Sequence, residues 1–136
     1  MIPTVRKGLL TLLALTSLLT AGCAGLFTGD DSPPLSMFID IPLPPELAID
    51  EKNSQVFEHE IGRVGLLKAS GRLGKAETLA FYRDKMAENG WAAESEFDNG
   101  EKHLLIFSKK PRSAAVTVQE GWVITDLEIN VSAKQP

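Results

Sequence analysis

The sequence predicts a small α+β domain over residues 46–134, a two-layer sandwich with one helix on one face of a mainly antiparallel sheet of about five to six strands. Three observations predict this class. One stretch, at about residues 75–89, has the apolar spacing of an amphipathic helix. Alternating apolar and polar residues fill segments on both sides of it. Short turn signals join these segments, and strands joined by tight turns run antiparallel.

Two strand-like segments, residues 54–60 and 63–73, precede the helix and are separated by Gly62, which predicts a hairpin. Residues 37–43 precede these two strands, and we call them the lead-in segment. It is too apolar for a free linker. We therefore expect it to lie along the domain and to bury Phe38 or Ile41.

The helix is predicted to begin after Gly74, a permissible N-cap, with Glu77 at its positive end. Asn89-Gly90 is a typical C-terminal stop. The apolar stripe of the predicted helix comprises Leu79, Tyr82 and Met86, and we interpret these residues as core.

Four strands are predicted after the helix, and Asp98-Asn99-Gly100 predicts a hairpin between the first two. The last strand alternates cleanly between apolar and polar residues, which indicates one buried face and one solvated face. The four segments are residues 91–97, 103–109, 113–119 and 123–132.

The predicted core is drawn from every element: Val64, Leu66, Leu79, Tyr82, Met86, Trp91, Leu104, Ile106, Val116, Val118, Leu127 and Ile129. Strand 103–109 also carries Leu105 and Phe107 on its opposite face. We expect the lead-in segment, a partner protein or a second copy to cover that face. The candidate partner surface comprises Leu105, Phe107, Lys109, Lys110 and Arg112.

The first 22 residues have the three parts of an export signal. Arg6 and Lys7 supply the positive charge, an uncharged Leu-rich run of 13 residues follows, and Ala21-Gly22-Cys23 supplies small residues at a cut. A membrane-spanning helix that continues to Phe27 is the alternative, because about 20 apolar residues span a bilayer.

Residues Leu19-Thr20-Ala21-Gly22-Cys23 resemble the lipobox of bacterial lipoproteins. Ala21, Gly22 and Cys23 match the usual Leu-Ala-Gly-Cys pattern, and Thr20 departs from it. The resemblance implies cleavage between Gly22 and Cys23 and a lipid on the Cys23 thiol. Two or three acyl chains, at ~0.8 kcal/mol per buried methylene, hold a protein stably at a membrane.

The resemblance also suggests the location. An Asp after the lipidated cysteine signals inner-membrane retention in enteric bacteria, so Ala24 points to the outer membrane, facing the periplasm. The expected organisation is a signal peptide at 1–22, a lipidated N-terminus and Pro-rich tether at 23–45, and the α+β domain at 46–134.

Removal of Arg6 and Lys7 leaves 12 basic and 18 acidic side chains, a formal net charge of −6. This acidic balance argues against nucleic acid as a partner. The lone cysteine excludes an internal disulfide. The acidic balance also disfavours anionic lipid head groups, which leaves the lipid on Cys23 as the expected link to a membrane.

We find no catalytic constellation, metal site or cofactor motif in the sequence. His59 and His103 fall on separate predicted strands, and the acids beside His59 point to its opposite face. No nucleophile elbow or phosphate-binding glycine loop is present. We therefore expect a non-enzyme.

Residues 79–91, with the hairpin after them, also resemble a small domain of uncharacterised proteobacterial lipoproteins, through Phe81-Tyr82-Arg83, Met86 and Gly90-Trp91. That family does not suggest any particular activity for this chain. The sequence favours a protein-binding or envelope-assembly module. The alternatives are a self-associating structural component of the envelope, and a small-ligand carrier or enzyme.

Overall fold

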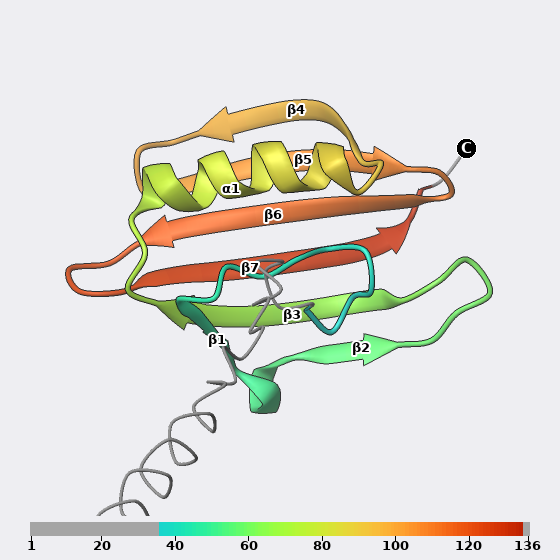
Figure 1. Cartoon of the computed structure of the whole chain (residues 1–136), viewed down its shortest axis with the longest axis horizontal. Helices are drawn as coiled ribbons and strands as arrows, with labels where there is room; N and C mark the ends of the chain where they lie inside the picture. The colour runs from blue at the N-terminus through green and yellow to red at the C-terminus, as the bar shows by residue number, and fades with distance from the viewer. Residues whose placement is uncertain (1–35, 135–136) are drawn as a thin grey trace, which may run out of the picture. The chain divides into compact units, whose positions relative to one another are not determined.

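The computed structural model describes residues 36–134, so the predicted signal peptide, Cys23 and most of the tether lie outside the described residues. One helix and one antiparallel sheet of seven strands make up the domain, which confirms the predicted α+β class (Figure 1). The elements in chain order are β1 (Leu47–Ile49), the 3-10 turn η1 (Glu51–Asn53), β2 (Gln55–Phe57), β3 (Val64–Gly71), α1 (Lys75–Glu88), β4 (Ala92–Asp98), β5 (Lys102–Lys109), β6 (Arg112–Glu120) and β7 (Thr125–Ala133).

The sheet has the strand order β1-β3-β7-β6-β5-β4, and β2 pairs with β3 beyond the end of β1. Strand β1 was not predicted, because three residues are too few to show alternation. After β3, the chain crosses the sheet through α1 to β4 at the far edge (Figure 1). Three antiparallel pairings then lead back to β7 beside β3.

Helix α1 begins and ends as its sequence predicts. The Glu77 carboxylate accepts a hydrogen bond of 2.9 Å from the Gly74 amide, which satisfies a free N–H at the N-terminus. At the other end Gly90 adopts a φ of +83°, and the Trp91 amide donates to the Met86 carbonyl. The β4–β5 turn is also as predicted, with Gly100 at a φ of +88°.

The core lies on one face of the sheet, under α1 and the lead-in segment. Figure 1 shows both of them crossing the same side of the strands. Phe38 and Ile41 are each fully buried, which confirms the prediction for the lead-in segment. They belong to one cluster with the helix residues Tyr82 and Met86 and with the inward side chains of β5, β6 and β7.

Two strands present the opposite face from the one predicted. Leu105 and Phe107 of β5 and Leu67 and Ala69 of β3 are buried. The predicted core residues of these strands are only half-buried: Val64, Leu66, Leu104 and Ile106. Side chains alternate strictly along a strand, so an error of one residue exchanges the faces. Leu79, Tyr82, Met86, Trp91, Val116, Val118, Leu127 and Ile129 are buried as predicted.

Candidate functional site

The two apolar residues of the candidate partner surface, Leu105 and Phe107, are buried in the core. Leu105 is 3% exposed and Phe107 is 1% exposed, because α1 and the lead-in segment cover the face of β5 that they occupy. Of the three alternatives for covering this face, the lead-in segment is the one that the structure shows, so Leu105 and Phe107 are not available to a partner. Lys110, another member of that surface, is exposed at the β5–β6 turn.

Lys109 and Arg112, the other two members of that surface, bind Asp40 of the lead-in segment. The Lys109 ammonium is 2.9 Å from the Asp40 carboxylate, and the Arg112 guanidinium contacts it at 2.5 Å and 3.3 Å. Arg112 is itself buried. Lys109 and Arg112 therefore hold a segment of their own chain, and no local pattern in the sequence indicated Asp40 as their partner.

The electrostatics of Asp40 follow from these contacts. Burial by itself would raise the pKa of Asp40, but hydrogen bonds from Arg112 and Lys109 outweigh burial, and the pKa lies below its ordinary value. The carboxylate is therefore ionised at neutral pH and neutralises a guanidinium that is nearly removed from water.

Trp91 and Arg63 complete the attachment of the lead-in segment. The Trp91 indole donates a hydrogen bond to the Asp40 carbonyl at 3.1 Å, and the Arg112 guanidinium lies 5.1 Å from the centroid of the Trp91 ring. Arg63 donates to the Met37 carbonyl at 2.9 Å. These residues fasten the segment over the core, which is a structural role.

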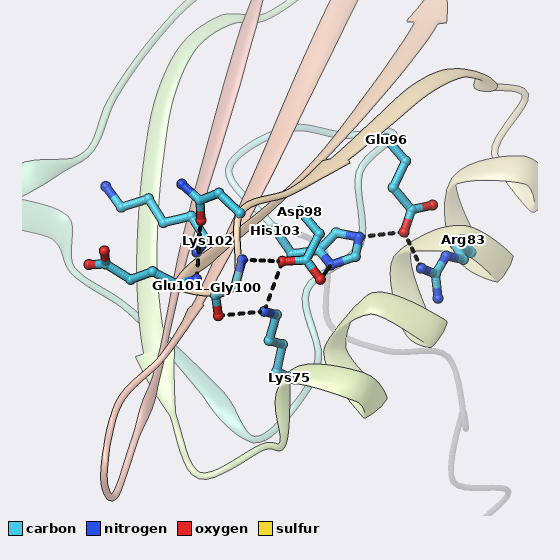
Figure 2. A network of polar contacts seen from close by, with 9 residues as sticks. Lys75, Arg83, Glu96, Asp98, Gly100, Glu101, Lys102 and His103 are labelled. Carbon is cyan, nitrogen blue, oxygen red and sulfur yellow. Dashed lines mark hydrogen bonds and ion pairs between the residues drawn. The ribbon is translucent and has the colours of Figure 1, made fainter.

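A second polar cluster surrounds His103, on β5 (Figure 2). One ring nitrogen contacts the Glu96 carboxylate, and the other is 3.3 Å from the Asp98 carboxylate. Both acids come from β4, where Asp98 pairs directly with His103. The predicted turn at Asp98-Asn99-Gly100 was the signal for this juxtaposition, since it sets which residues of β4 and β5 face each other.

Cations from α1 contact both carboxylates of this cluster (Figure 2). Arg83 pairs with Glu96, and the Lys75 ammonium is 3.6 Å from Asp98. The Arg83 hydrogen bond, followed by that of His103, lowers the pKa of Glu96. A hydrogen bond from the Gly100 amide, with the nearby Lys75 charge, lowers the pKa of Asp98 against the opposing effect of desolvation.

The His103 cluster links strands and helix rather than presenting a reactive group. Each ring nitrogen already faces a carboxylate, and a general base needs one nitrogen within reach of a substrate. His59, the other histidine, lies after β2 and its ring nitrogen accepts a hydrogen bond from the Ile61 amide. Within residues 36–134, no group of three His, Cys, Asp or Glu side chains has an arrangement that could hold a metal ion.

The face of the sheet opposite α1 carries a hollow of about 800 Å³. Leu104 and Thr117 lie on its floor, and Phe97, which is 61% exposed, lies at the β4 side. The charged lining residues are Asp50, Lys68, Asp98, Lys102, Asp126 and Glu128. Lys68 is 3.5 Å from Glu128. The Asp98 carboxylate faces His103 and Lys75 on the α1 side, so three acids against two lysines leave the hollow with a small surplus of negative charge. We call it the open-face hollow.

Gly22 and Cys23, the predicted cleavage and lipidation residues, lie outside the described residues. In the part of the chain that the structure describes, no helix is long and apolar enough to cross a membrane.

In a comparison with protein families, the helix and the strands after it match one family model. Residues 75–134, from the start of α1 through β7, match a family model described as START domain-like. The match covers less than half of the chain. Comparisons with curated proteins and with solved structures give no match.

Proposed function

We propose that this chain is a lipoprotein held at the outer membrane by a lipid on Cys23, facing the periplasm, and that its domain is a protein-binding or envelope-assembly module. The open-face hollow is the observation that carries the binding role. The lipobox-like residues that end in Ala21-Gly22-Cys23 support the anchor.

The open-face hollow has the make-up of a protein interface. Interfaces combine an apolar centre with a polar rim. Here Leu104 and Phe97 supply the apolar contact, and charged side chains border them. The surplus of carboxylates favours a partner segment that carries lysine or arginine, because complementary charge speeds encounter and selects the partner.

The binding role is tested by a photoreactive residue at Thr117, in the floor of the hollow, in the full-length protein in intact cells. The matched control carries it at Asp84, on the exposed side of α1. We expect one discrete adduct from Thr117, none from Asp84, and loss of the adduct with Leu104→Glu while circular dichroism shows that the variant is still folded. No adduct from Thr117, or the same adducts from both positions, contradicts the proposal. An adduct of twice the chain mass supports self-association instead.

The anchor is tested by intact mass spectrometry of the native protein, with Cys23→Ser as the control. The expected mass is that of residues 23–136 plus a diacylglyceryl group, with or without an amide-linked acyl chain. The Cys23→Ser protein should lack the lipid. An uncleaved, unmodified N-terminus contradicts the anchor.

A small-ligand carrier is a second candidate, because ligand pockets commonly measure about 300–1,000 Å³ and the open-face hollow is within this range. Native mass spectrometry of protein purified from the envelope distinguishes the two functions. A carrier shows a non-covalent small molecule that is lost with Leu104→Glu and retained with Asp84→Asn. A mass equal to that of the protein alone disfavours the carrier.

A further inference from the structure

The β6–β7 turn exposes three consecutive large apolar side chains at the end of the sheet. Trp122 is fully exposed, Val123 is 68% exposed and Ile124 is 44% exposed. We call residues 122–124 the apolar tip. Isolated exposed apolar residues are common, but a consecutive run at a protruding turn is disfavoured in water unless it meets another surface.

A backbone hydrogen bond closes the turn that carries the apolar tip. The Gly121 amide donates to the Ile124 carbonyl at 2.8 Å, directly beyond the last strand pair, Glu120 with Thr125. A Cβ at Gly121 would lie 2.8 Å from that carbonyl oxygen, so the turn depends on glycine there. Thr125 is 2% exposed and seats the turn on the core. A preformed tip loses little conformational entropy on binding.

The apolar tip lies at the opposite end of the sheet from the place where the lead-in segment begins. Thr125 pairs with Gly71, the last residue of β3, whereas Arg63, just before β3, binds Met37. Figure 1 shows the β6–β7 turn projecting beyond the strands at one end. Nine residues of β6, at ~3.3 Å each, separate the two ends by ~30 Å.

A chain anchored at Cys23 can bring the apolar tip to the same bilayer. Twelve residues, 24–35, separate Cys23 from Ser36, and at ~3.3 Å each they reach at most ~40 Å. This exceeds the ~30 Å length of the sheet. The anchor then supplies a high local concentration of the tip at the lipid surface, so a weak second contact suffices. This step rests on the proposed lipid anchor.

The chemistry of the tip fits the interface of a bilayer. Trp is enriched at membrane–water interfaces because its ring is apolar and its N–H is polar. A protruding tip enters a lipid surface without a complementary pocket. Arg72, exposed beside it, can place its guanidinium among phosphates. Exposed Glu120 and the acidic domain disfavour an anionic surface.

We propose that the apolar tip inserts into the headgroup region of a zwitterionic bilayer, and that it gives the domain a second membrane contact and a defined orientation. The contact places the β6–β7 end of the sheet at the lipid.

The test uses the mature lipoprotein reconstituted into phosphatidylcholine vesicles that contain lipids brominated at shallow acyl positions. Bromine quenches a nearby indole. Trp91 is 3% exposed and contributes equally to the wild type and to Trp122→Phe, so the difference isolates Trp122. We expect at least twofold quenching of the Trp122 emission, and a weaker effect with Val123→Asp.

The matched control introduces Phe57→Trp into the Trp122→Phe protein. Phe57 is 61% exposed and pairs with Val64, at the other end of the sheet. The indole introduced there should remain unquenched. Equal quenching of both indoles means that the domain lies flat on the lipid, which overturns the proposal.

Trp122 that stays unquenched while the protein floats with the vesicles also overturns it. Protection of Trp122 only in native envelopes would then identify a protein as the occupant. The proposal about the apolar tip and the proposal about the lipid anchor can be contradicted independently of each other. Intact mass reports the lipid on Cys23, and quenching reports the tip.

Discussion

Leu104 and Leu105 are neighbours on β5, with the same side chain, on opposite faces of one sheet. Leu105 is 3% exposed under α1 and the lead-in segment, whereas Leu104 is half-buried in the floor of the open-face hollow. The strand itself does not distinguish them, because both faces of β5 are apolar. The covering segments decide which side chain stabilises the fold and which remains available for contact.

Truncation of the two leucines should give the largest contrast. We expect Leu105→Ala to lower the free energy of unfolding by about 2–5 kcal/mol, because it leaves a cavity in a packed core. Leu104→Ala should cost about 1 kcal/mol, because a half-buried side chain loses less apolar contact. Urea denaturation of both variants measures the difference. Equal losses would mean that the open face is covered in solution.

The attachment of the lead-in segment should give the next largest effect. We expect Asp40→Ala to cost about 1–3 kcal/mol, because it leaves the buried Arg112 guanidinium without its carboxylate. Glu58→Ala is the matched control, since the Glu58 side chain is 71% exposed and its pair with Arg63 should contribute less than about 1 kcal/mol. Thermal unfolding compares the two. The same small loss in both variants would show that the Asp40 contacts do not hold the segment.

Acid should destabilise the attachment of the lead-in segment and the β4–β5 edge of the sheet together. The pKa values of Asp40, Glu96 and Asp98 are lowered in the folded chain. A carboxylate with a lower pKa in the folded than in the unfolded state stabilises the fold above the unfolded-state pKa, and that contribution is lost as the pH falls through the folded-state pKa.

Stability should therefore decline as the pH falls below about 4, near the pKa of an ordinary carboxylate, and towards the lower folded-state pKa values. The measurement is the urea midpoint between pH 7 and pH 2.5, for the wild type and for Asp40→Asn. The variant should show a shallower decline. A midpoint independent of pH would contradict the contribution of these carboxylates.

The smallest expected effect on stability concerns Tyr82, in the core on the α1 side of the sheet. The Tyr82 hydroxyl is buried and has no hydrogen-bond partner within residues 36–134, and burial raises the pKa of Tyr82. Tyr82→Phe removes a desolvated polar group and keeps the ring, so we expect a gain of up to about 1 kcal/mol in the free energy of unfolding. Denaturation midpoints measure it. A loss above 1 kcal/mol would show that the hydroxyl is hydrogen-bonded in solution.

Local patterns predicted the elements whose signals lie within a few residues. The spacing of Leu79, Tyr82 and Met86 predicted α1, and Asn89-Gly90 predicted its end. Asp98-Asn99-Gly100 predicted the β4–β5 turn. These features depend on backbone conformation and on one-sided burial, which nearby residues determine by themselves.

The sequence by itself thus determined the α+β class, the helix, the hairpins and the apolar character of the lead-in segment. The tertiary structure alone decided which face of β3 and β5 is inside, because both faces of each strand carry large apolar side chains and a shift of one residue exchanges them. It also decided the partners of Arg112 and His103. Asp40 is 72 residues from Arg112 in the chain, and only packing of the lead-in segment over the core brings their charges together.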